Sequence, residues 1–237
     1  MSPYAQTIVQ LQAQAQRCGL DASARGYIAG VHAMALELFS GRHRGSGRPF
    51  LSHLVATSSI LLAHGQPLHV VAAGLVHATY EQGDFGHAAS ADDRRAIASI
   101  AGERAEAAAY AYAARGWTAA AATTASTAPI STDLERDVLL MRLANELDDH
   151  LDAGILYCAD AERRLARLAR LEAPLLALAR HLGVPELADE LADAFAQCRS
   201  TVVPVALRGR TGSSYLQVPR SCTLRWRSRW QARGHRH

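Results

Sequence analysis

The chain has 237 residues, of which 49% are hydrophobic, 20% are charged and 6% are aromatic. This length and composition are typical of a globular protein with a substantial core, and they exclude a disordered, collagen-like or disulfide-stabilised chain. The longest apolar run, residues 70–76, is too short to cross a bilayer, and no secretory signal is visible in the first residues. The four cysteines form no CxxC pair. We therefore expect a reduced, cytoplasmic protein without a membrane span.

The net charge of +3 is unevenly distributed along the chain. Residues 199–237 contain nine Arg and no acidic residue, so they carry +9 and residues 1–198 carry −6. The acidic body, residues 1–198, does not indicate a nucleic-acid binder. The Arg-rich tail, residues 199–237, contains alternating Arg and Trp that could stack on bases, so nucleic acid is a partner only through the tail. We expect this tail to be disordered and assign it no function.

Helical patterns follow one another through the first half of the body. Residues 8–17 and 22–39 predict two helices, the second ended by a glycine. Three glycines in residues 41–49 predict a loop, and Pro49 is well placed to begin the next helix. Beyond a short turn, residues 68–82 are almost wholly apolar and predict a central helix. The helix that follows Pro49 carries an amphipathic stripe of Leu51, Leu54, Val55, Leu61 and Leu62.

Helices also dominate the second half of the body. They are expected over residues 92–100, 104–115, roughly 132–152, 160–181 and 186–198. Ser90 and Ser131 are the expected N-caps of the first and third of these helices. Residues 119–128 are rich in Ala and Thr and predict no definite structure. Strand patterns are absent before residue 200, and residues 202–207 favour at most a short strand, so the predicted fold class is all-α.

Two stretches carry the chemistry of the chain. The first reads Arg42-His43-Arg44-Gly45-Ser46-Gly47-Arg48-Pro49-Phe50-Leu51-Ser52-His53, and the second reads Ala72-Ala73-Gly74-Leu75-Val76-His77-Ala78-Thr79-Tyr80-Glu81. His77 follows His53 by 24 residues, and Leu143-Ala144-Asn145 occurs further on. This pattern resembles the HD-domain (p)ppGpp hydrolases of the RelA/SpoT type and their small stand-alone relatives. Those proteins have a basic loop, an SG-x-P-aromatic turn and a His, followed by AA-x-L-x-H-D-x-x-E-D and LAD motifs at matching spacing.

The resemblance covers roughly residues 25–180 and implies an HD-domain-like helical bundle. In that family two His nitrogens and two carboxylates hold a divalent ion, usually Mn²⁺, which polarises a phosphate ester and activates a water. His53 and His77 match the two His ligands. Glu81 matches the Glu one turn beyond the motif and can share a helix face with His77.

The chain departs from the family pattern where negative charge is needed. The motif Asp is Ala78, the acid after the Glu is Gln82, and the distal Asp is Asn145. Two histidines without a carboxylate should hold Mn²⁺ weakly. We therefore expect a degenerate metal site with no metal cofactor, for which His53 and His77 are the residual candidates.

Nearby residues could rebuild the site or line a pocket. Asp148 and Asp149 follow Asn145 by three and four residues, so either could reach the same face. Further candidates are Asp84, His43, His87 and His150. The resemblance implies that Arg44 packs on a purine base, and Tyr80 lies one turn from the motif histidine. An exposed basic loop, core-edge packing of Tyr80 and two structural histidines are the alternative interpretations.

Three functions are compatible with these residues. The first is a protein that keeps the pocket and binds a small anionic or nucleotide-like molecule through Arg44, His53, His77, Tyr80, Glu81 and Asn145. In that case His77 and Glu81 could still act as general acid and base without metal. The second is a phosphohydrolase that acts on a nucleotide pyrophosphate through Mn²⁺ and replacement ligands. The third is a non-catalytic interaction scaffold. The sequence decides neither whether the protein is an enzyme nor its oligomeric state.

Overall fold

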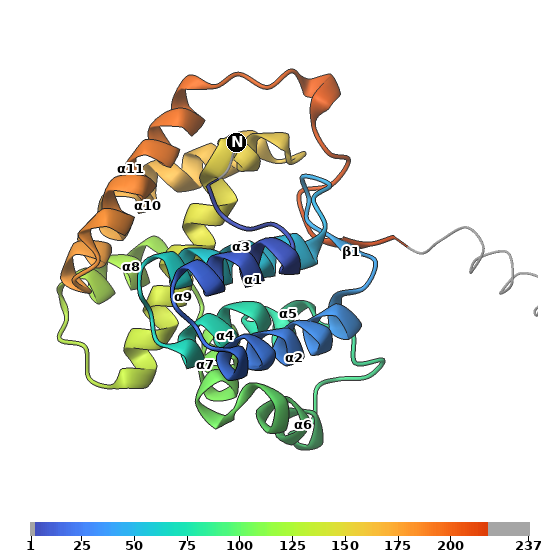
Figure 1. The fold of residues 1–237 in the computed structure, drawn as a ribbon. Helices are drawn as coiled ribbons and strands as arrows, with labels where there is room; N and C mark the ends of the chain where they lie inside the picture. The colour runs from blue at the N-terminus through green and yellow to red at the C-terminus, as the bar shows by residue number, and fades with distance from the viewer. Residues whose placement is uncertain (1–2, 218–237) are drawn as a thin grey trace, which may run out of the picture.

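Helices form almost all of the regular structure in residues 3–217, the part of the chain that the computed structural model describes (Figure 1). The α-helices are α1 (Ile8–Arg17), α2 (Ala22–Phe39), α3 (Phe50–Ala63), α4 (Leu68–Val76), α5 (Thr79–Gln82), α6 (Ala91–Ala101), α7 (Glu103–Ala114), α8 (Ala119–Thr127), α9 (Asp133–His150), α10 (Ala161–His181) and α11 (Pro185–Ser200). Two 3₁₀ helices, η1 (Leu151–Tyr157) and η2 (Val205–Leu207), and two short strands, β1 (Arg42–His43) and β2 (Tyr215–Leu216), complete it. The all-α prediction is confirmed.

Capping side chains set the starts of several helices. Thr7 accepts a hydrogen bond from the Gln10 amide in a reciprocal capping box before α1, and Asp21 caps α2 in the same position. Both helices occupy the residues that the sequence predicts. Ser90 caps α6 as expected, whereas the cap of α9 is Thr132 rather than Ser131.

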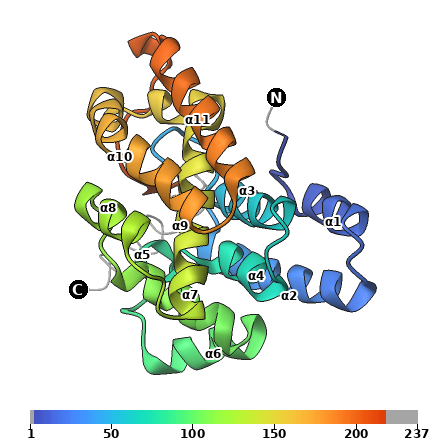
Figure 2. The ribbon, with the colours of Figure 1, turned by 90° about the vertical axis from the view of Figure 1, so that its left-hand side faces the viewer.

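Helices α3, α4 and α9 form the centre of the molecule. Every residue of α4 from Val70 to Val76 is buried, in agreement with its continuous apolar sequence. Gly74 lets α4 approach α3 closely, because a Cβ there would lie 2.9 Å from the Ser58 hydroxyl and 2.9 Å from a methyl of Leu61. Figure 2 shows α9 passing between the α3–α4–α7 group and the α10–α11 pair. This arrangement brings α3, α4 and α9 together at one point.

The predicted helix over residues 68–82 is interrupted. Helix α4 ends at Val76, and α5 begins at Thr79, so His77 and Ala78 lie at a break between them. The Nδ1 atom of His77 lies 2.9 Å from the carbonyl oxygen of Gly74, within the last turn of α4. The break therefore orients the His77 ring, which periodicity alone does not predict.

Two further expectations need correction. The Ala/Thr-rich stretch, for which no definite structure was expected, forms α8. Residues 202–207 form no strand; they contain the 3₁₀ helix η2. None of the helices within residues 3–217 is both long enough and apolar enough to cross a bilayer.

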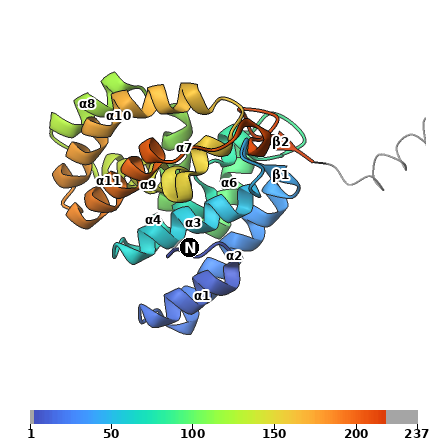
Figure 3. The ribbon, with the colours of Figure 1, turned by 90° about the horizontal axis from the view of Figure 1, so that it is seen from above.

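The chain beyond Arg199 also differs from the expected disordered tail as far as the structure describes it. Helix α11 continues to Ser200, and the following residues return along the body until β2 pairs antiparallel with β1 (Figure 3). In this ladder Arg42 is opposite Leu216 and His43 is opposite Tyr215. Residues 218–237, which include the alternating Arg and Trp, lie outside the described residues.

Candidate functional site

His53 and His77 lie side by side at the centre of the bundle. His53 comes from the first turn of α3 and is 0% exposed, and His77 follows α4 and is 1% exposed. Their Nε2 atoms are 3.3 Å apart. The structure thus brings together the two histidines that the motif spacing singled out.

The hydrogen bonds around the histidine pair determine where its protons lie. His77 Nδ1 must donate to the Gly74 carbonyl, because a carbonyl oxygen can only accept. When His77 is neutral, its Nε2 atom then carries a lone pair, which faces His53 Nε2 at 3.3 Å. On the other side of its ring, His53 Nδ1 lies 2.6 Å from Asp148 Oδ2, within hydrogen-bond distance. Every ring nitrogen of the pair thus has a polar protein atom within hydrogen-bond distance.

Burial shifts the pKa values of His53, His77 and Asp148 in the directions that favour their neutral forms. Burial lowers the pKa of His77 to about 4 and that of His53 well below its usual value. Burial also raises the pKa of Asp148, against the opposing charge of Arg48. These directions favour neutral imidazoles at both histidines, while the Arg48 guanidinium acts to keep the Asp148 carboxyl ionised.

Two arginines of the loop before α3 pair with the acids at the end of α9. The Arg48 Nη1 atom donates to both carboxylate oxygens of Asp148, at 2.8 and 2.9 Å. Its Nη2 atom donates to the Ser52 carbonyl at 3.0 Å and to the Gln6 side chain. Arg44 forms an ion pair with Asp149. Burial acts to raise the pKa of Asp149, but the Arg44 guanidinium holds it below its usual value.

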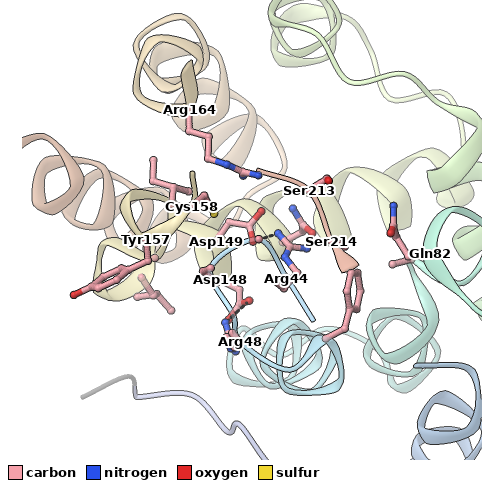
Figure 4. Close-up of a pocket in the computed structure, with 18 of the residues that line it drawn as sticks. Arg44, Arg48, Gln82, Asp148, Asp149, Tyr157, Cys158, Arg164, Ser213 and Ser214 are labelled. Carbon is pink, nitrogen blue, oxygen red and sulfur yellow. Dashed lines mark hydrogen bonds and ion pairs between the residues drawn. The ribbon is translucent and has the colours of Figure 1, made fainter. Parts of the chain in front are cut away.

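A cavity of about 770 Å³ opens beside these residues (Figure 4). Four of the predicted site residues line it: Arg44, His77, Glu81 and Asn145. His53 lies behind His77, outside the lining residues. Tyr80 also lies outside the lining, because its hydroxyl donates to Glu106 at 2.6 Å. The structure therefore separates Tyr80 from the pocket that the sequence proposed for it.

Among the acidic groups that line the cavity, Glu81 and Asp152 have no ion-pair or hydrogen-bond partner for their side chains within residues 3–217. Burial raises the pKa of Glu81, although the charge of Arg142 acts in the opposite direction. The Tyr112 ring forms another part of the wall and meets the His77 ring edge-on, with centroids 5.0 Å apart. Arg142 stacks behind it, 3.8 Å from the Tyr112 ring centroid. No sequence motif marks Tyr112 or Arg142.

The other candidates take structural positions. His43 stacks on Tyr215, and His87 lies in the exposed segment that precedes α6. His150 is buried, and its Nδ1 atom lies 2.6 Å from the Glu146 carbonyl. Asp84 does not line the cavity.

The histidine pair lacks two of the carboxylates that the divalent-ion site of the resembling family has. The two Nε2 atoms lie within hydrogen-bond distance of each other, and the motif positions of the two carboxylates hold Ala78 and Asn145. One group of donor atoms, from His53, Asp148 and Asp149, does lie within 4.8 Å. It faces the Nδ1 end of His53, away from His77, and both of its carboxylates are already paired with arginines.

Comparisons with known proteins agree with the fold. The domain of unknown function DUF6817 matches residues 37–115, a range that contains both histidines and Glu81. No curated protein matches the chain. Among solved structures, it is similar to a metazoan ortholog of SpoT described as hydrolysing ppGpp and playing a role in starvation responses. The two share 16% identity and a TM-score of 0.52, over 74% of this chain and 97% of the other.

This chain has an HD-type fold. The likeness at 16% identity establishes the fold alone, and the chemistry of the site has to be argued from its own residues.

Proposed function

We propose that the cavity binds a small, phosphate-bearing, nucleotide-like molecule without a metal ion. The observation that carries this proposal is the pairing of Arg48 with Asp148 beside the bonded histidine pair. In a metal site, the ion's positive charge would neutralise such a carboxylate. Here a guanidinium provides that charge, and the two imidazoles satisfy each other.

The cavity has the size and the groups that such a ligand needs. Its volume of about 770 Å³ lies within the usual range of small-molecule sites. The Arg44 guanidinium lies 5.4 Å from the Phe50 ring, at the cavity wall. The resemblance implies that a purine packs on this arginine, and a phosphate could also take Arg44 over from Asp149. Arg164 also lines the cavity, as Arg44 and Arg48 do, and its Nε atom donates to Asp160 at 2.8 Å.

Glu81 is the best placed group for acid–base chemistry, if the bound molecule reacts. His77 is less available, because its two nitrogens are bonded to Gly74 and His53. Glu81 lines the cavity, and burial raises its pKa above the usual value, a direction that favours the protonated form, which can give a proton to a leaving oxygen. We therefore assign the acid–base role to Glu81 and a positioning role to His77.

Thermal denaturation with ligands tests the binding proposal. A ligand at a hundredfold excess over its Kd stabilises the protein by about 2.7 kcal/mol, which for a chain of this length corresponds to a rise in Tm of about 5–11 °C. We expect such a shift with a nucleoside diphosphate or a nucleotide pyrophosphate, and its loss in Arg44→Met. The matched control is Arg95→Met on the exposed face of α6. The absence of any shift across nucleotides and pyrophosphate would refute the proposal.

A metal-dependent phosphohydrolase remains the second candidate, because His53, Asp148 and Asp149 place donor atoms within 4.8 Å. An ion there has to displace Arg44 and Arg48 from the carboxylates. Mn²⁺ titration by calorimetry separates the candidates. The metal-free proposal predicts no stoichiometric binding by the wild-type protein and a gain of binding in Ala78→Asp/Asn145→Asp. Stoichiometric Mn²⁺ in the wild type that is lost in Asp149→Asn would favour the phosphohydrolase.

A further inference from the structure

Residues 208–217, which we name the C-terminal strap, contribute to the lining of the cavity. Gly212, Ser213 and Ser214 of the strap line the cavity together with Arg44 and Asp149 (Figure 4). The strap follows α11 and η2 in the sequence, far from the motifs that carry the resemblance. It therefore adds residues to the site that neither composition nor spacing marks.

Two sets of contacts hold the strap in place. At its end, β2 pairs with β1, the Gln217 amide donates to the Gly41 carbonyl at 2.8 Å, and Tyr215 stacks on His43. Nearer its start, the Gly209 amide donates to the Tyr157 carbonyl at 2.6 Å. The strap is thus attached to β1, which leads into the loop of residues 44–49 (the Arg44 loop), and to the segment between α9 and α10.

Further contacts join the strap to α10 and to the residues just before it. The Arg164 side chain donates to the Gly212 carbonyl at 2.6 Å and also binds Asp160. The Ala159 amide donates to the Thr211 carbonyl at 3.4 Å. Arg164 therefore connects a cavity-lining charge directly to the strap.

Glycines allow the strap to approach this closely. A Cβ at Gly209 would lie well under 3.0 Å from the Gly45 carbonyl oxygen, and one at Gly212 would lie 2.5 Å from the Asp160 carboxyl carbon. Neither glycine has a positive φ, so the limit is contact with its neighbours rather than backbone conformation. The strap and the loop that holds Gly45 are consequently in backbone contact above the cavity.

We propose that the C-terminal strap is a wall of the binding site: it holds the Arg44 loop in its binding position and presents Ser213 and Ser214 to the phosphate of the ligand. Hydroxyl groups and arginine side chains are common donors to phosphate oxygens. The Ser214 hydroxyl has no hydrogen-bond partner within residues 3–217. The role of the two serines rests on the proposed function, whereas the role of the strap as a wall does not.

The rate at which a thiol reagent labels Cys158 measures opening of the strap, and this measurement needs no ligand. It lines the cavity and is 5% exposed, while Cys198 is 0% exposed in the core against α9. Burial raises the pKa of both thiols, to about 11 for Cys198, so labelling rates are compared at one pH. With Cys18 and Cys222 replaced by Ser in the full chain, reaction of Cys158 reports opening of the wall. Reaction of Cys198 reports global unfolding.

The test compares Gly209→Ala with Gly116→Ala, since a Cβ at Gly116 meets nothing within 4 Å. We expect Cys158 to react with a thiol reagent at least about tenfold faster in Gly209→Ala than in the control, with the Cys198 rate unchanged. Tyr215→Ala, which removes only the stacking on His43, is a milder second variant and should show the same selectivity. Equal Cys158 rates in both strap variants and the control would overturn the proposal.

Calorimetry with GDP tests the serines separately. Ser213→Ala/Ser214→Ala should weaken GDP binding by about tenfold, and Ser200→Ala, outside the cavity, should leave it unchanged. Equal GDP affinity in Ser213→Ala/Ser214→Ala and in the Ser200→Ala control would reject the role of Ser213 and Ser214. Failure of GDP to bind the wild-type chain would count against the proposed function, while the Cys158 result would still decide whether the strap is a wall.

Discussion

Replacing Arg48 with Met gives the sharpest test of the charge balance at the site. The substitution removes both hydrogen bonds that Asp148 receives from Arg48 and leaves a carboxyl group whose side chain is 1% exposed. Removing one partner of a buried ion pair costs about 3–5 kcal/mol. The Arg48 side chain is 28% exposed, and partial screening by solvent places the expected loss near the lower end, about 3 kcal/mol. For a chain of this length, that loss lowers Tm by about 6–12 °C.

Urea denaturation at pH 7 measures this loss, with Arg95→Met as the control. The Arg95–Asp92 pair is 73% and 82% exposed, so its loss should change the free energy of unfolding by no more than about 0.5 kcal/mol. The double variant Arg48→Met/Asp148→Asn removes both charges and should recover most of the stability. If Arg48→Met is no less stable than Arg95→Met, Arg48 does not neutralise Asp148 and the reasoning fails.

The same variant predicts a pH dependence. Burial raises the pKa of Asp148, so the folded protein holds a proton on this carboxyl more tightly than the unfolded chain does. Such a group favours the folded state increasingly as the pH falls. The deficit of Arg48→Met should therefore shrink between pH 7 and pH 5, and a deficit that is constant or grows over this range would contradict the assignment.

Three other substitutions have defined outcomes. Gly74→Ala should lower the free energy of unfolding by about 1–3 kcal/mol, because its Cβ would lie 2.9 Å from Leu61. The control Gly30→Ala, whose Cβ would meet nothing within 4 Å, should not destabilise the protein. Equal denaturation midpoints of the two variants would refute the close packing of α3 and α4. Burial lowers the pKa of His77 from 6.5 to about 4, so the unfolded chain takes up a proton that the folded protein excludes, and stability should fall as the pH drops from about 6.5 to about 4. His77→Asn should flatten this part of the urea-denaturation profile, and an unchanged slope would assign the acid sensitivity to other groups. Glu81→Gln should leave Tm unchanged or raise it, because burial disfavours the charged carboxylate. The same variant should abolish any metal-independent turnover of a bound nucleotide. Retained turnover would show that Glu81 takes no part in the chemistry.

Local sequence predicts much of the helical framework, because helix formation depends on nearby residues. The α1 and α2 boundaries agree with the structure since Thr7 and Asp21 cap them within three residues along the chain. The spacing of His53 and His77 also predicts that they meet, because it matches a known arrangement of two packed helices. The break between α4 and α5 is a different case, since the apolar pattern continues into Ala78 without a Pro or Gly to interrupt it.

The sequence by itself determined the all-α class and, through its motif spacing, predicted the histidine pair, with Ala78 and Asn145 at positions where the resembling family has carboxylates. Only the tertiary structure decided which charged side chains pair beside the histidines. The pairing of Arg48 with Asp148 joins residues 100 positions apart, and β1 meets β2 across more than 170 residues. Such partners are selected by burial and by contact geometry, which depend on how all the helices pack, and a local pattern carries no record of them.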